Sequence, residues 1–145
     1  MPTRRLTKAD AVVLDTNILV SALLIQTGYP AAIYRAWREG HFTLLTCAEQ
    51  LDELRATLRK PAIAARIKPY KAGGLVNELK RLAESVDAFP CVRRSPDSTD
   101  DFLLALSEAG RADYLVTGDK CGLLVLNQHK DTRIVSARVF AALFV

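Results

Sequence analysis

The stretch AVVLDTNILVSALL, residues 11–24, decides the fold that we expect for this chain. An apolar run at residues 12–14 leads directly into Asp15, and a second apolar run begins at Ile18. The first run has the length of a short buried strand, and the second suits the helix that comes after it. We therefore expect Asp15 at the carboxyl end of a strand, which is where open α/β sheets bind ligands.

Strands and helices alternate along the rest of the sequence. We expect further strands at residues 41–46, 89–92, 114–117 and 133–135. We expect helices at residues 31–39, 48–59, 62–67, 75–86 and 100–109, with a final helical turn after the last strand. Pro61 interrupts the helical pattern, and Gly73 with Gly74 weakens it again. This alternation predicts a mostly parallel sheet with helices on both faces.

The composition is that of a single globular domain. The chain has 145 residues, of which 50% are hydrophobic and 25% are charged, so it can bury a sizeable core. We expect one domain over residues 11–145 after a flexible segment at residues 1–10. No apolar stretch approaches the about 20 residues of a membrane span, and MPTRRLTKAD lacks the apolar centre of a secretory signal. We therefore expect a cytoplasmic protein without a membrane partner.

The cysteines argue against two further classes of protein. Cys47, Cys91 and Cys121 are odd in number, widely spaced and without a CxxC motif. Neither a disulfide framework nor a zinc site is indicated by such a pattern. We expect buried thiols.

The charges are distributed unevenly, although the net charge of +4 is mild. Residues 51–94 carry ten Lys and Arg against five acids, whereas residues 95–120 carry six acids and two bases. An acidic centre beside a basic span suits a metal site that receives a polyanion. A solvated helical face explains the basic span equally well.

Acidic residues recur at comparable points of the expected fold. Asp15 ends the first strand, Asp119 lies two residues beyond the strand YLVT, and Asp100 with Asp101 opens the helix FLLALSEA. Loops at one edge of a parallel sheet bring such positions together. Carboxylates held this close repel one another unless a cation sits among them, and oxygen ligands suit Mg²⁺ or Mn²⁺.

Each of these acids also has a purely structural explanation. Asp100 or Asp101 suits a helix N-cap, and Asp119 suits an ordinary turn. Asp15 could form a structural hydrogen bond with Asn17. Glu53 lies away from the apolar stripe formed by neighbouring leucines, so periodicity alone predicts a solvated glutamate.

Taken in order, four segments resemble the PIN-domain family, in particular its prokaryotic branch of toxin components from toxin-antitoxin systems. The segments are VVLDTNILVSALL, ELRATLRKP, SPDSTDDFLLALSEAG and ADYLVTGDKCGLL, which together span most of residues 12–124. The resemblance implies a Rossmann-like α/β/α sandwich. It also implies a carboxylate cluster that binds Mg²⁺ or Mn²⁺ and endoribonuclease activity.

The resemblance assigns roles to individual residues of this sequence. The cluster would comprise Asp15, Glu53, Asp119 and a third acid that is either Asp100 or Asp101, because both fit the spacing. Asn17 and Thr117 would be polar supports beside the first and last acids, and Ser21 lies one helical turn beyond Asn17. The residues after Asp119 depart from the common pattern. There, Cys121 and Gly122 replace a polar and an apolar residue.

The resemblance also implies partners. By this resemblance, RNA would be the substrate, a small antitoxin protein would be the inhibitor, and the chain would form a homodimer. Four basic residues of the helical span are candidates to hold the RNA backbone, since phosphate contacts position a strand without reading its sequence: Arg55, Arg59, Arg66 and Lys68.

Three other readings compete with an active nuclease. A phosphotransferase of the haloacid dehalogenase type needs a second Asp where this chain has Asn17. A response-regulator receiver needs its phosphoacceptor Asp at a central strand end, whereas LDELRATL reads as helix. The serious alternative is a catalytically inactive PIN-like module that binds RNA or a protein, and the presence of all the acids argues against it.

Overall fold

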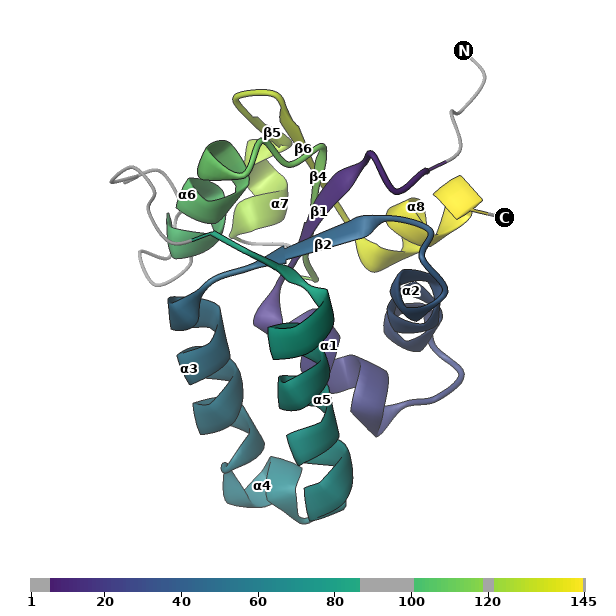
Figure 1. The fold of residues 1–145 in the computed structure, drawn as a ribbon, viewed down its shortest axis with the longest axis vertical. Coiled ribbons are helices and arrows are strands. Elements are labelled where there is room, and N and C mark those ends of the chain that lie inside the picture. Colours follow the sequence, from purple (N-terminus) through teal and green to yellow (C-terminus); the bar gives the residue numbers. More distant parts are fainter. Residues whose placement is uncertain (1–5, 87–100, 119–121, 145) are drawn as a thin grey trace.

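The computed structural model describes residues 6–86, 101–118 and 122–144, and these residues build one sheet covered by helices (Figure 1). The strand order is β3-β2-β1-β4-β6-β5, and every neighbouring pair is parallel except β5 with β6. The strands are β1 (Ala11–Leu14), β2 (Thr43–Thr46), β3 (Glu84–Ser85), β4 (Tyr114–Val116), β5 (Gln128–His129) and β6 (Thr132–Val135). The expected α/β class with a mostly parallel sheet is confirmed.

Helices precede or follow most of the strands along the chain. They are α1 (Thr16–Leu24), α2 (Tyr29–Arg38), α3 (Ala48–Leu58), α4 (Pro61–Ala64), α5 (Pro69–Leu82), α6 (Asp101–Ala109), α7 (Leu123–Leu126) and α8 (Ala137–Ala141), with a final 3-10 turn at Ala142–Phe144. No single helix in the described ranges is both long and apolar enough to cross a membrane. Only α1 and α2 taken together, across a bend of 100°, meet the criteria of length and composition.

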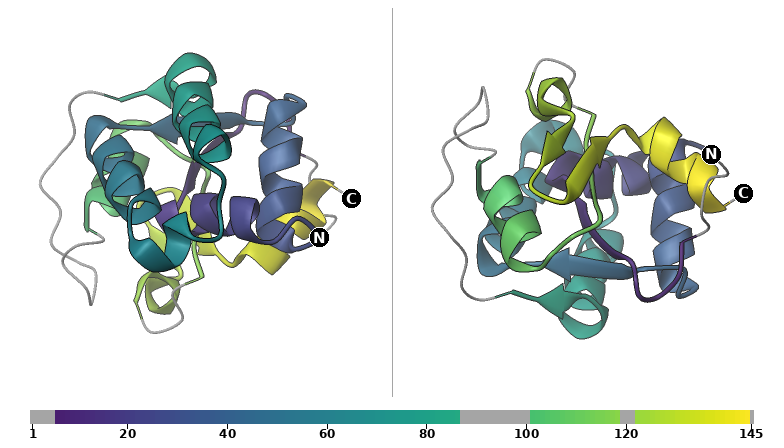
Figure 2. Two further views of the ribbon diagram at one scale, coloured as in Figure 1. Left: turned by 90° about the horizontal axis from the view of Figure 1, so that it is seen from below. Right: turned by 90° about the horizontal axis from the view of Figure 1, so that it is seen from above.

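The alternation of side chains along each strand divides the core between the two faces of the sheet. Val12 and Leu14 of β1 belong to one apolar cluster with residues of α1, α2, α3, α5 and α8. Val13 belongs to the other cluster, with residues of α6 and α7. Successive residues of a strand point to opposite faces, so a continuous apolar strand needs helices on both sides. Viewed from above, α6 and α7 lie on the near side and α3, α4 and α5 behind them (Figure 2).

Three helices form a lobe that extends away from the sheet. In this helical lobe α3 and α5 lie side by side, and α4 joins them at the far end (Figure 1). On its other side α5 is attached to α2 through Glu78, which accepts a hydrogen bond from the Tyr34 hydroxyl and pairs with Arg38 at 3.0 Å. Burial, followed by the hydrogen bond to Glu78, raises the pKa of Tyr34, so the phenol stays protonated as the donor. This contact fixes the orientation of α5.

The structure corrects the expected boundaries of α5. The helix begins at Pro69, continues through Gly73 and Gly74, and ends at Leu82. Pro69 suits the first helical turn because its missing N–H would have no partner there, and the buried Leu75 and Leu79 anchor the helix beyond the glycines. Expected helical residues 84–85 instead form β3, which pairs with β2. Both β3 residues are exposed and polar, so this strand results from its neighbour rather than from its own pattern.

Other boundaries differ less, and some expectations fall outside the described residues. The expected helix at 62–67 is shortened to α4, and the antiparallel strand β5 was not expected. The expected strand at 89–92 lies outside the described residues. Leu6, within the segment expected to be flexible, is 7% exposed and belongs to the larger apolar cluster.

Candidate functional site

The order of the strands creates a switch point between β1 and β4. The chain moves from β1 to β2 and β3 on one side, and later places β4 on the other side of β1. Loops that leave two such strands diverge, and the crevice between them is the usual ligand site of an open α/β sheet. Asp15 directly follows β1, and Thr117 directly follows β4. The structure therefore brings together two of the predicted site residues.

Asp15 is held rigidly at this edge. Its side chain is buried, with the residue only 5% exposed, and it caps the N-terminus of α1. One carboxylate oxygen, Oδ1, accepts a hydrogen bond from the backbone N–H of Asn17 at 3.1 Å. The other, Oδ2, accepts one from the Thr117 hydroxyl at 2.8 Å. These two hydrogen bonds, one to each oxygen, orient the Asp15 carboxylate.

The other predicted supports behave differently from Thr117. Thr117, which was expected beside the last acid, is fully buried and donates its hydroxyl proton to Asp15, the first acid. Asn17 supports Asp15 through its backbone N–H, and the residue itself is exposed. Ser21 is half-buried in α1, and its carbonyl accepts the N–H of Ile25 at the end of that helix.

A buried glutamine joins the helix after β2 to the end of β1. Gln50 of α3 is 1% exposed, and its Nε2 donates to the carbonyl of Leu14 at 2.6 Å. Its Oε1 accepts the hydroxyl proton of Thr46 at 2.7 Å. Leu14 immediately precedes Asp15, so the Gln50 amide fixes the backbone that carries this acid. Sequence reasoning missed Gln50, although it lies four and eight residues before Leu54 and Leu58 on the apolar stripe of α3, where a polar residue needs partners.

Glu53 lies one helical turn beyond Gln50 on α3. It is half-buried, whereas Glu49 on the same helix is exposed. Cys47, the N-cap of α3, directly follows β2 at the point where this helix begins. Burial, chiefly, raises the pKa of this thiol, and the charges of Glu49 and Glu53 raise it further. Cys47 is thus a buried and protonated thiol, as expected from the cysteine pattern.

Of the remaining predicted acids, the structure describes only Asp101. Asp101 is the first residue of α6 and is half-buried. Asp100 and Asp119 lie outside the described residues, as do Cys91 and Cys121. Within the described ranges, no three His, Cys, Asp or Glu side chains converge as a metal-binding group. The described acids nevertheless suit a hard cation in their chemistry, since they offer oxygen ligands only.

The hydroxyl of Thr16, next to Asp15, is buried and has no hydrogen-bond partner among these residues, which fits a site that a ligand completes.

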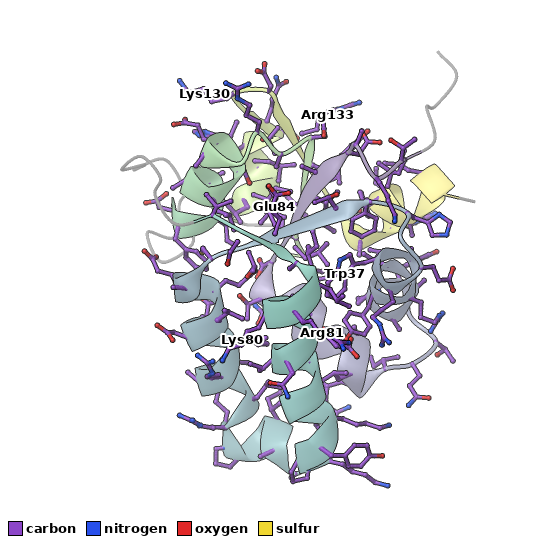
Figure 3. The ribbon with its side chains drawn as sticks, viewed as in Figure 1. Trp37, Lys80, Arg81, Glu84, Lys130 and Arg133 are labelled. Carbon is purple, nitrogen blue, oxygen red and sulfur yellow. The ribbon has the colours of Figure 1, made fainter. Side chains whose placement is uncertain are left out.

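The predicted RNA-binding residues divide into two groups. Arg55 and Arg59 of α3 line a groove of about 590 Å³ in the helical lobe, together with Lys80 of α5. Figure 3 shows Lys80 extending from α5 toward α3. Arg66 and Lys68 are exposed but do not line this groove. Sequence reasoning did not select Lys80, although it lies four and eight residues after Val76 and Ala72 on one face of α5.

Comparisons with known proteins agree with this architecture. The family model described as PIN domain matches residues 11–121. No curated protein matches the sequence. Among solved structures, PAE2754 from Pyrobaculum aerophilum is 16% identical, with a TM-score of 0.58 over 98% of this chain and 96% of that chain. VapBC2 from Rickettsia felis, crystallised with a DNA fragment from their promoter, is 13% identical, with a TM-score of 0.57 over 87% of this chain and 98% of that chain.

These two structures share the fold at low identity, whereas the family model matches the sequence from β1 to beyond β4. PIN domains are generally nucleases that use divalent metal ions. The matched range contains Asp15, Glu53, Thr117 and Asp119. By its sequence and by its fold, this chain belongs to the PIN-domain family.

Proposed function

We propose that the protein is a metal-dependent endoribonuclease that hydrolyses RNA phosphodiester bonds. The observation that carries the proposal is the Asp15 carboxylate, buried at the β1–β4 switch point and oriented through both of its oxygens. A structural N-cap needs only one of these hydrogen bonds, the one from Asn17. The second bond comes from the Thr117 hydroxyl at the end of the neighbouring strand and supports a role for Asp15 beyond capping.

The acids of this edge are proposed to bind one or two Mg²⁺ or Mn²⁺ ions. The ligands would be Asp15, Glu53, Asp119 and either Asp100 or Asp101. Bound by these acids, such an ion would supply the chemistry of lowering the pKa of a water and neutralising charge on a phosphate. Asp15 supplies a ligand whose direction is already set, because Thr117 and the N-terminus of α1 hold its carboxylate in place. Gln50 keeps α3, and with it Glu53, against the end of β1.

The basic residues of the helical lobe are proposed to hold the RNA backbone. Arg55 and Arg59 converge on one groove, which supports them as a phosphate-binding pair. Arg66 and Lys68 are exposed farther along the lobe and add positive charge there. These residues attract RNA without selecting its sequence.

We further propose that the chain is the toxin of a toxin-antitoxin pair, acts in the cytoplasm and forms a homodimer. Support comes from the fold shared with VapBC2 of Rickettsia felis. A small antitoxin protein is the proposed inhibitory partner.

The proposal is tested with a mixed pool of labelled single-stranded RNAs, incubated with Mg²⁺, with Mn²⁺ or with a chelator. We expect cleavage by the wild type with either metal ion and none with chelator. Parallel Asp100→Asn and Asp101→Asn variants identify the third acid, because only the ligand's variant loses cleavage. A protein that binds these RNAs without cleaving them under any condition would instead be the inactive, RNA-binding form of the fold.

Thr117→Val tests whether the hydroxyl positions Asp15. Valine has nearly the same shape, so we expect a folded protein that cleaves RNA between about tenfold and about a hundredfold more slowly, as is typical when a group orienting a metal ligand is lost. Thr132→Val is the matched control, because Thr132 is also buried and its hydroxyl donates to the Ala112 carbonyl at 2.6 Å, before β4 rather than after it. Equal losses of activity in both variants would mean that Thr117 acts only on stability.

A further inference from the structure

The groove of the helical lobe combines an apolar floor with a basic rim. Its floor is formed by aliphatic side chains from all three helices and the turns between them, including Leu58, Ile67 and Val76. Its rim carries Arg55 and Arg59 from α3 and Lys80 from α5. No residue that lines the groove is acidic.

The positive charge of this groove is largely uncompensated. Arg59 and Lys80 are exposed and have no ion-pair partner within the described part of the chain, and Arg55 reaches only the exposed Asp52, at 3.4 Å. Glu78, which is the acid of α5, is turned to the other side of that helix by Tyr34 and Arg38 of α2. Two helices therefore contribute cations to one groove that no acidic side chain lines.

One wall of the groove lacks a side chain at Gly73 of α5. A glycine inside a helix destabilises the helix relative to alanine. The fold does not require either glycine of α5, because a Cβ at Gly73 or Gly74 would meet no atom within 4 Å. Gly73 lines the groove beside Ala72, whereas Gly74 does not. The missing side chain at Gly73 thus leaves room for another molecule to approach the backbone of α5 closely.

We propose that this groove docks an amphipathic, acidic helix of a partner protein. A helix laid between α3 and α5 would bury its apolar side chains on the floor, which is the helix-in-groove mode of recognition. Its flanking carboxylates would meet Arg55 and Arg59 on one side and Lys80 on the other. Phosphates alone would leave the apolar floor unused, so a purely polyanionic ligand fits less well. Where Arg55 and Arg59 also contact RNA, a consequence that rests on the proposed function, the bound helix competes with the substrate.

The probe is a fluorescent peptide of about 15 residues with leucines at helical spacing i, i+3, i+4 and i+7 and glutamates elsewhere. A peptide with lysines in place of the glutamates and a scrambled acidic peptide serve as comparisons. We expect the acidic peptide alone to bind the full chain, with affinity that falls as salt rises. Gly73→Leu fills the groove and should weaken binding about tenfold or more, which corresponds to about 1.4 kcal/mol. Gly74→Leu is the matched control and should bind as the wild type does.

Two charge-reversal variants of α5 provide a second test. Lys80→Glu should weaken binding at least about fivefold, since it reverses one rim charge, whereas Arg81→Glu should not, because Arg81 does not line the groove. Equal binding of the acidic, basic and scrambled peptides, or equal effects of the paired variants, would overturn the proposal. If Gly73→Leu and Lys80→Glu reduce binding of a single-stranded RNA while no peptide binds, the groove holds RNA instead. All of these readouts are binding measurements, so they stand apart from any failure of RNA cleavage.

Discussion

Asp15→Asn is expected to abolish metal-dependent RNA cleavage, with a loss of at least about a hundredfold, while the protein remains folded. An amide binds a hard cation far less well than a carboxylate does. The fold should persist because asparagine is as good an N-cap as aspartate, and its Oδ1 can still accept the Asn17 N–H. The Thr117 hydroxyl can rotate to accept a proton from the new amide instead of donating one.

Two measurements make this result specific. Thermal unfolding should show Asp15→Asn within a few degrees of the wild type, and cleavage should be measured with saturating Mg²⁺ and Mn²⁺. Asp131→Asn is the matched control, because Asp131 is exposed in the β5–β6 turn, and its activity should not change. Undiminished cleavage by a folded Asp15→Asn protein would show that the catalytic site does not lie at this edge of the sheet.

Gln50→Leu is expected to have the largest effect on stability among the site residues. Leucine has a similar volume but leaves the Leu14 carbonyl and the Thr46 hydroxyl without their partner. A buried polar group that loses its partner costs about 1–3 kcal/mol, so we expect a loss of about 2–4 kcal/mol in the free energy of unfolding. Urea denaturation measures this loss. The β1–α3 contact also positions Asp15 relative to Glu53, so cleavage by the folded fraction should fall about tenfold.

Gln128 provides a control that separates the effect of burial from the effect of losing a hydrogen bond. Gln128 also donates its amide to a backbone carbonyl, that of Lys130 at 2.8 Å, but it is exposed in β5. Gln128→Leu should change stability by no more than about 0.5 kcal/mol, because water replaces the lost partner. If Gln50→Leu is equally mild, the Gln50 amide does not hold the end of β1.

The central strands could be predicted because their residues carry the signal by themselves. Continuous apolar runs at β1 and β4 need cover on both faces, and this requirement gives the parallel sheet and the position of Asp15 at its edge. The contact between Thr117 and Asp15 could not be predicted in this way, because it depends on β1 and β4 lying side by side and ending in register at Leu14 and Val116. That pairing is a property of the folded sheet.

The edges of the fold could not be predicted in this way. β3 is a strand only because its exposed backbone pairs with β2, and no apolar alternation marks Glu84 and Ser85. The helix α5 continues through Gly73 and Gly74 because Leu75 and Leu79 are buried against the core, which outweighs the low helix propensity of glycine. Local pattern fails where the stabilising contacts come from distant parts of the chain.

The sequence by itself determined the α/β class and the presence of an acid at the end of the first strand, because hydrophobic periodicity and strand length are local properties. Tertiary structure alone decided which side chains meet: the Thr117 hydroxyl with Asp15, the Gln50 amide with the Leu14 carbonyl, and the cations of α3 with Lys80 of α5. Each of these contacts joins residues that are distant in sequence, and their separation is set by strand order and helix packing. No spacing along the chain encodes that separation.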